Sequence, residues 1–141
     1  MWMSEAQKAR LTAYRAAMDA AVEAAREDTA AINRVAALVR PWRPGVYAAG
    51  DVRVYGGIPY RCVQAHDSTQ NLAWTPDATP ALWMQYHGTT PETARPWVAP
   101  AGAHDMYRAG EYMIWTDGLT YRCTQDTAFS PADQPQAWET I

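Results

Sequence analysis

Hydrophobic and polar positions along the first forty residues follow the period of an α-helix. Residues 4–39 contain neither glycine nor proline, and alanine dominates. Ser4 is a suitable N-cap with Gln7 three residues later, and Pro41 disfavours helical geometry at Arg40. The pattern therefore predicts one helix of about 36 residues, which would extend about 54 Å.

This helix carries a heptad repeat. Eight of its nine a and d positions hold alanine or an apolar residue; the a positions are Leu11, Met18, Ala25, Ile32 and Val39, and the d positions are Tyr14, Ala21, Asp28 and Val35. Asp28 is the exception, either a defect or a device that sets register and oligomer state. The repeat favours a coiled coil and a homo-oligomer, with a trimer as first choice and a dimer as second. The alternative is one amphipathic helix that packs on its own β domain.

Beyond residue 40 the pattern changes to short alternating strands and turns, and it occurs twice. Gly50-Asp51 leads into a strand that starts at Val52, and Gly56-Gly57 turns the chain back as a hairpin. The blocks that recur, first copy before second, are Arg40–Trp42 and Arg95–Trp97, Tyr47–Val52 and Tyr107–Tyr112, Val54-Tyr55 and Ile114-Trp115, Tyr60–Gln64 and Tyr121–Gln125, and Trp74–Trp83 and Phe129–Trp138. An internal repeat of this kind indicates two similar structural units.

The predicted fold is therefore a long N-terminal α-helix, a coiled coil, followed by two small all-β modules, each a short antiparallel meander. The expected divisions are a helical oligomerisation or anchoring segment over 1–40, the first β module over 41–86, a linker over 87–95 and the second β module over 96–141. Cys62 and Cys123 occupy equivalent positions, so each is expected to fill the core of its own module as a free thiol.

Composition excludes several classes of function. The net charge of −3 provides no basic field for nucleic acid, and no apolar run is long enough for membrane insertion. The N-terminus shows no signal peptide, so synthesis in the cytoplasm is expected. The three histidines have no partners at metal-ligand spacing, and no acid, base or nucleophile arrangement is recognisable. We expect no enzyme activity, no metal and no cofactor.

The landmarks of the first copy resemble a known family. Trp42, Tyr47, Gly50-Asp51, Tyr55, Gly57, Tyr60 and the closing Trp83 resemble the type 3 chitin-binding fold, which comprises carbohydrate-binding modules of the family 5/12 kind. The variant motifs Tyr60-Arg61-Cys62, Gln64-Ala65-His66 and Trp74-Thr75-Pro76 look closer to modules in phage and prophage tail-associated proteins. The resemblance covers residues 41–86 well and 96–141 more loosely, and it does not include the helix.

One departure from the family bears on the ligand. Chitin-binding members usually carry two adjacent tryptophans that stack on the sugar, and here the matching positions are Gln64-Ala65 and Gln125-Asp126. The resemblance therefore implies the fold but makes chitin doubtful as the ligand.

Other aromatic and polar residues are candidates for contacting a glycan. Sugars bind shallow surfaces by stacking on aromatic rings beside hydrogen-bonding groups. The candidates are Tyr55, Gln64, His66, Asp67 and Trp74 in the first copy and Trp115 in the second. The alternative for Trp74, and for its equivalent Phe129, is that each fills a core.

The favoured function is a non-enzymatic structural or adhesive component of a phage virion, such as a tail, a tail fibre or another surface appendage. Its helix would assemble subunits or contact other virion proteins, and its modules would contact a cell-surface glycan. The expected location is then the virion, after synthesis in the host cytoplasm. The alternatives are a soluble carbohydrate-binding accessory protein and a fragment of a hydrolase whose catalytic domain lies elsewhere.

Overall fold

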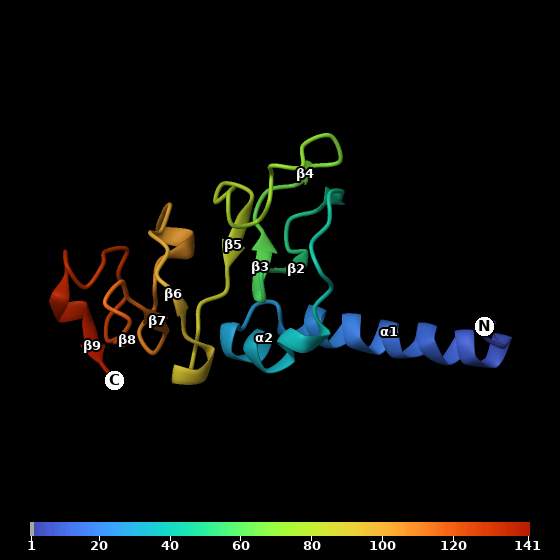
Figure 1. Cartoon of the computed structure of the whole chain (residues 1–141), viewed down its shortest axis with the longest axis horizontal. Coiled ribbons are helices and arrows are strands. Elements are labelled where there is room, and N and C mark those ends of the chain that lie inside the picture. Colours follow the sequence, from blue (N-terminus) through green and yellow to red (C-terminus); the bar gives the residue numbers. More distant parts are fainter. Residues whose placement is uncertain (1) are drawn as a thin grey trace.

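A computed structural model describes residues 2–141 and places a helical segment and two β modules along one long axis (Figure 1). The helical segment contains α1 (Glu5–Ala25), α2 (Thr29–Val35) and the 3-10 turn η1 (Ala36–Leu38). The first module contains β1 (Val46–Tyr47), β2 (Val52–Tyr55), β3 (Ile58–Cys62), β4 (His66–Asp67) and β5 (Trp83–Gln85). The second contains β6 (Arg95–Pro96), β7 (Tyr112–Ile114), β8 (Thr120–Cys123) and β9 (Trp138–Thr140), with the 3-10 turns η2 (Pro91–Thr93), η3 (Ala103–Asp105) and η4 (Pro135–Ala137).

The helical segment bends after Ala25, so the prediction of one continuous helix is wrong. The capping box of Ser4 and Gln7 starts α1 as predicted. Asp28 then starts a second helix, because its carboxylate accepts a 3.2 Å hydrogen bond from the backbone N–H of Ala31. The polar residue at a heptad d position is thus an N-cap, a position that aspartate strongly favours. Among residues 2–141, neither α-helix combines the length and apolarity that a membrane span requires.

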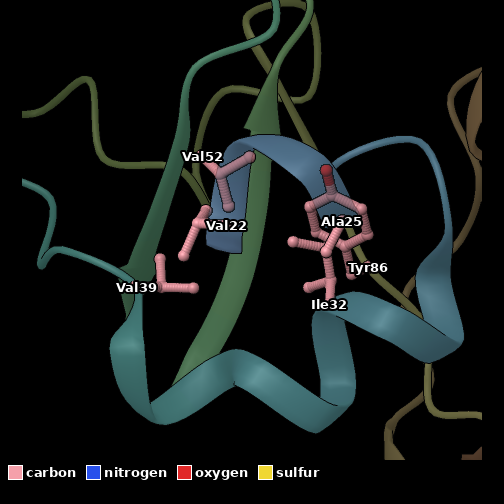
Figure 2. Close-up of a cluster of buried hydrophobic side chains, with 6 residues drawn as sticks. All are labelled: Val22, Ala25, Ile32, Val39, Val52 and Tyr86. Atoms are coloured by element: carbon pink, nitrogen blue, oxygen red, sulfur yellow. The ribbon is translucent and has the colours of Figure 1, made fainter. Parts of the chain in front are cut away.

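The bend folds the second half of the helical segment onto the first module. A shared core contains Val22, Ala25, Ile32, Val39, Val52 and Tyr86 (Figure 2). Ion pairs at its edge join Asp19 to Arg40 at 2.8 Å and Glu27 to Arg61 at 2.8 Å. Three predicted seam residues, Ala25, Ile32 and Val39, are therefore buried within the chain and are unavailable to a coiled coil. The alternative, packing on the chain's own β domain, describes this half, while the first turns of α1 project away from the modules (Figure 1).

Strands β2-β3-β5 and β7-β8-β9 form antiparallel meanders as predicted, whereas β6 adds a parallel pair that was not predicted. The three-stranded sheet of the first module has the order β2-β3-β5, and β1 pairs with β4 in a separate ribbon. Gly56 and Gly57 connect β2 to β3 with φ values of +58° and +79°, which suits a two-residue hairpin turn. The sheet of the second module has the order β6-β7-β8-β9, in which β6 pairs with β7 in parallel. The isolated parallel bridge from Pro41 to Val54 is its counterpart in the first module.

Equivalent residues of the two modules make the same contacts. The backbone N–H groups of Gly50 and Gly110 donate 2.8 Å hydrogen bonds to the carbonyls of Cys62 and Cys123. Each cysteine also lies opposite the closing tryptophan of its module, Trp83 or Trp138. Both cysteines are buried and free, which confirms the prediction. Burial raises the pKa of the Cys123 thiol to about 11 and so suppresses its thiolate form.

We predict that Trp83→Ala and Trp138→Ala each unfold their own module. The two side chains are 2% and 7% exposed, and removing a buried tryptophan costs about 3 to 5 kcal/mol. A module of about 45 residues has little stability in excess of that loss. Near-ultraviolet circular dichroism during thermal unfolding measures the effect. Trp74→Ala, which removes a 38% exposed ring, is the matched control with a change below about 1 kcal/mol. Unaltered melting of either buried variant would contradict the core role.

Candidate functional site

A small hollow between the modules is too small for a sugar. One hollow lies between the Pro76–Pro80 loop of the first module and residues Val98 and Asp105 of the second, and it encloses about 60 Å³. Typical small-molecule sites enclose at least about 300 Å³. A larger open hollow of about 370 Å³ lies beside Arg26, Arg61 and His104, but no Trp, Tyr or Phe of the described chain lines it. A polymeric ligand that stacks on aromatic rings would therefore contact exposed side chains on an open surface of the protein. Among residues 2–141, no group of three or more His, Cys, Asp or Glu side chains is placed to hold a metal ion.

The segment after β3 brings four of the predicted site residues together. β3 ends at Cys62, Gln64 is exposed, and β4 starts at His66 by pairing with Tyr47 of β1. His66 Nδ1–H donates a 2.7 Å hydrogen bond to the Gln64 carbonyl, which fixes the imidazole ring. The ring centroid then lies 5.7 Å from that of Trp83 and 6.5 Å from that of Trp74. His66 thus links the buried core to the exposed loop.

Asp67 shapes the loop that follows. Its Oδ1 atom accepts hydrogen bonds from the backbone N–H of Thr69 at 2.9 Å and from the Thr69 hydroxyl at 2.6 Å. Both bonds favour the charged carboxylate and hold the pKa of Asp67 below its ordinary value. The other carboxylate oxygen has no hydrogen bond to residues 2–141 and can accept one from a ligand hydroxyl.

Trp74 and Phe129 present apolar faces to solvent. Trp74 is 38% exposed and Phe129 is 59% exposed, so neither side chain fills a core. Their positions are nevertheless equivalent, since each lies nine residues before the closing tryptophan of its module. Half-exposed aromatic rings are the type of surface on which sugars stack.

Tyr55 and Trp115 lie elsewhere. Tyr55 ends β2 beside the Gly56-Gly57 hairpin, whereas Gln64, His66 and Trp74 follow the opposite end of β3. Both aromatic rings are half-buried, and each packs edge-on against a tryptophan with ring centroids 5.8 Å apart: Tyr55 against Trp42, and Trp115 against Trp97. The six candidates therefore do not form one cluster: the loop group is Gln64, His66, Asp67 and Trp74.

Two exposed apolar residues near this group were not predicted. Val46 is the register partner of Asp67 across the β1–β4 ribbon, and Leu72 lies two residues before Trp74. Both are largely exposed. The exposure of Val46 could have been predicted from strand alternation: Tyr47 points into the core, so the adjacent side chain in the strand points outward. Leu72 lies in an irregular turn, where no periodicity predicts the direction of a side chain.

Sequence comparisons place the loop group within a known kind of module. Residues 41–84 match the model of carbohydrate-binding module family 5/12, which confirms the predicted resemblance for this part of the chain. This is a family of non-catalytic binding modules, and the match ends before the second module.

The similar proteins are much longer than this chain. Streptogrisin-C of Streptomyces griseus is 51% identical over 45 residues, which are 31% of this chain and 9% of its own length. Chitinase Chi52 of Paenibacillus xylanexedens is 42% identical over 69 residues, which are 43% of this chain and 12% of its own length. A family GH18 chitinase from Chromobacterium violaceum aligns structurally with a TM-score of 0.32 and 29% identity, over 43% of this chain and 16% of that chain. The chain thus spans about a tenth of the length of the two sequence relatives.

We predict that Asp67→Ala loosens the loop, because it removes both acceptor bonds to Thr69. Hydrogen exchange of the Thr69 amide should become faster, while Asp67→Asn, which keeps an acceptor oxygen, should preserve its protection. The pKa of Asp67 is lowered by folding, so the contribution of the carboxylate is present above the unfolded pKa and is lost as pH falls through the folded pKa. An NMR titration of the Thr69 amide should therefore have its midpoint below pH 3.8. A midpoint at or above that value would contradict the assignment.

Proposed function

We propose that the protein is a non-catalytic carbohydrate-binding protein whose first module binds a polysaccharide on the open surface around Trp74. The observation that carries the proposal is the exposed face of Trp74 beside free polar groups, within a segment that matches a carbohydrate-binding family. The ring supplies a stacking surface for the apolar face of a sugar. Gln64 and Asp67 supply an amide and a carboxylate oxygen for its hydroxyls.

The proposed ligand is a polysaccharide that can bind through stacking on a single aromatic ring. Gln64 and Ala65 occupy the positions at which chitin-binding members usually carry their two tryptophans. Trp74 replaces that pair only in part, because it provides a single ring. Binding to an isolated module is therefore expected to be weak, with a Kd near the millimolar value that corresponds to about −4 kcal/mol.

The second module is proposed to be a weaker module of the same kind. Twelve positions separate Cys62 from Trp74, but only six separate Cys123 from Phe129, so the second loop is shorter. Its Gln125 is exposed, like Gln64, but the Asp126 carboxylate already accepts bonds from Arg108 and Ala109. Phe129 then provides a smaller ring with fewer polar groups free beside it.

Self-association is proposed to take place through the first turns of α1. Leu11 and Tyr14 are 51% and 61% exposed, and with Met3, Gln7 and Arg10 they line a shallow groove. The heptad spacing places Leu11 and Tyr14 at a and d, so a second copy of this helix is the partner that fits. The available seam is short because the later heptads are buried in the chain. A trimer remains the first choice and a dimer the second.

A role in a virion is proposed only as one use of such an assembly. An exposed helix that gathers several weak sugar-binding modules suits a surface appendage, because linked weak sites bind with raised effective concentration. The relatives named above do not bear on a virion. A carbohydrate-binding protein that acts apart from any particle is the second candidate, and a monomeric state would favour it.

We predict that Trp74→Ala weakens polysaccharide binding about tenfold or more, which corresponds to about 1.4 kcal/mol. The measurement is depletion of the full chain from solution by insoluble chitin, cellulose and peptidoglycan. Trp2→Ala is the matched control, because Trp2 is exposed but lies on the N-terminal side of α1. If the unaltered protein binds none of the three polymers, or if Trp74→Ala binds as well as Trp2→Ala, the proposed site is wrong.

We predict that Leu11→Glu with Tyr14→Glu converts the oligomer to a monomer, measured by sedimentation velocity. Deleting residues 1–40 is unsuitable, because it would remove core residues such as Ile32 and Val39. Ala13→Glu with Ala16→Glu adds the same charge at exposed heptad positions c and f, away from the seam, and should leave the oligomer intact. A monomeric unaltered protein, or equal effects of the two variants, would contradict association through this face.

A further inference from the structure

The two modules are joined by a short segment, Tyr86–Gly88, that bonds to both sheets. The backbone N–H of Tyr86, just after β5, donates a 3.0 Å hydrogen bond to Pro59 of the first sheet. Two residues later the carbonyl of Gly88 accepts a 2.9 Å bond from Tyr112 of the second sheet. The chain between the modules therefore continues the sheet pairing instead of forming a free linker.

Buried side chains of the second module also contact this connecting segment, Tyr86–Gly88, which we call the joint. The ring of His87 stacks on Tyr107 with centroids 3.7 Å apart, and its Nδ1–H donates a 2.7 Å bond to Glu111. His87 and Glu111 are both buried. Rotation of one module against the other would separate the stacked rings and leave a buried carboxylate without this partner, which is costly.

Helix α2 contacts the joint as well, through the side chain of Asn33. Asn33 donates a 3.0 Å bond to the His87 carbonyl and accepts a 2.7 Å bond from Arg95. Gly88 adds a steric constraint, since a Cβ atom there would lie 2.4 Å from the Thr93 carbonyl oxygen. The helical segment, the joint and the second module therefore form one connected network.

This joint places the modules in the same orientation. In Figure 1 the labelled strands follow one order along the long axis, from β2, β3 and β5 to β6, β7, β8 and β9. β5 and β9 run towards the same side, and the loops that precede them, residues 68–82 and 124–134, lead in from the opposite side. Trp74 belongs to the first of these loops and Phe129 to the second. Along this axis β3, β5 and β6 lie between β2 and its equivalent β7, so the modules are offset by several strand spacings of about 4.8 Å each.

We propose that one extended polysaccharide strand binds across both modules at once, with Trp74 and Phe129 as its two stacking faces. This inference rests on the proposed function and adds the second contact. A polymer can reach across the offset, whereas a disaccharide contacts one module only. Because the joint is already ordered, the second contact loses little orientational freedom on binding and raises the affinity for the polymer.

The test uses the full chain with Leu11→Glu and Tyr14→Glu as parent, so that self-association does not add to the binding. Phe129→Ala is introduced into it, and binding is measured to insoluble chitin and cellulose and to their disaccharides. Phe129 is largely exposed, so the substitution leaves the fold intact. We expect Phe129→Ala to weaken binding to the polymer at least tenfold and to leave the disaccharide affinity, carried by Trp74, unchanged within twofold. Val98→Ala, an exposed apolar residue of the same module, is the control with no effect on either.

A second variant addresses the joint itself. Gly88→Ala should lower polymer binding towards the value of Phe129→Ala while preserving disaccharide binding, because it displaces the modules without altering the Trp74 loop. Equal polymer binding by Phe129→Ala and its parent would overturn the two-module contact and leave the proposed function of the first module standing. A parent that binds neither polymers nor disaccharides would overturn both.

Discussion

Each β module closes its core with a tryptophan from its last strand, and that packing is the interaction on which the rest of the structure depends. A chain of about 45 residues buries too little surface to be stable with much in reserve. Trp83 and Trp138 meet Tyr47 and Tyr107 edge-on at 4.9 and 5.2 Å, each above the cysteine of its own module. Trp83 also begins β5, which leads directly into the joint at Tyr86–Gly88. One short stretch of chain therefore both closes the core of the first module and positions the second module.

Local sequence signals predicted the parts of the fold that local contacts determine. The Gly56-Gly57 hairpin, the Ser4 capping box and the two separate cysteines all follow from residues close in sequence or from the repeat. The bend at Asp28 was not predicted, because its heptad position and its capping ability point to different structures. Packing on the first module decided between them: Ile32 is buried against the strands only if the helix turns back. Tertiary contacts of this kind have no signal in the helical period.

The candidate site was predictable in its residues and less so in its arrangement. Gln64, His66, Asp67 and Trp74 lie within eleven consecutive residues, so their grouping depends on one loop. Tyr55 belongs to the opposite end of the hairpin, and only the register of β2 with β3 reveals that. The joint was hidden for a similar reason, since Asn33 and Glu111 are far apart in the sequence and meet at His87 only in the folded chain.

The bend at Asp28 divides the helical segment into two halves with different roles. Its second half belongs to the first module, and through Asn33 it also stabilises the joint, so it determines how the modules face a ligand. Its first half makes few contacts with the modules and keeps its apolar residues exposed (Figure 1). A change at Leu11 would therefore affect the proposed association without disturbing the modules, whereas a change at Ile32 would disturb the core that positions them. Weak sugar-binding faces gain most from being held at a fixed spacing, because the ordering is then complete before the ligand arrives. The half that packs on the first module provides that order, and the projecting half is the part proposed to associate with further copies.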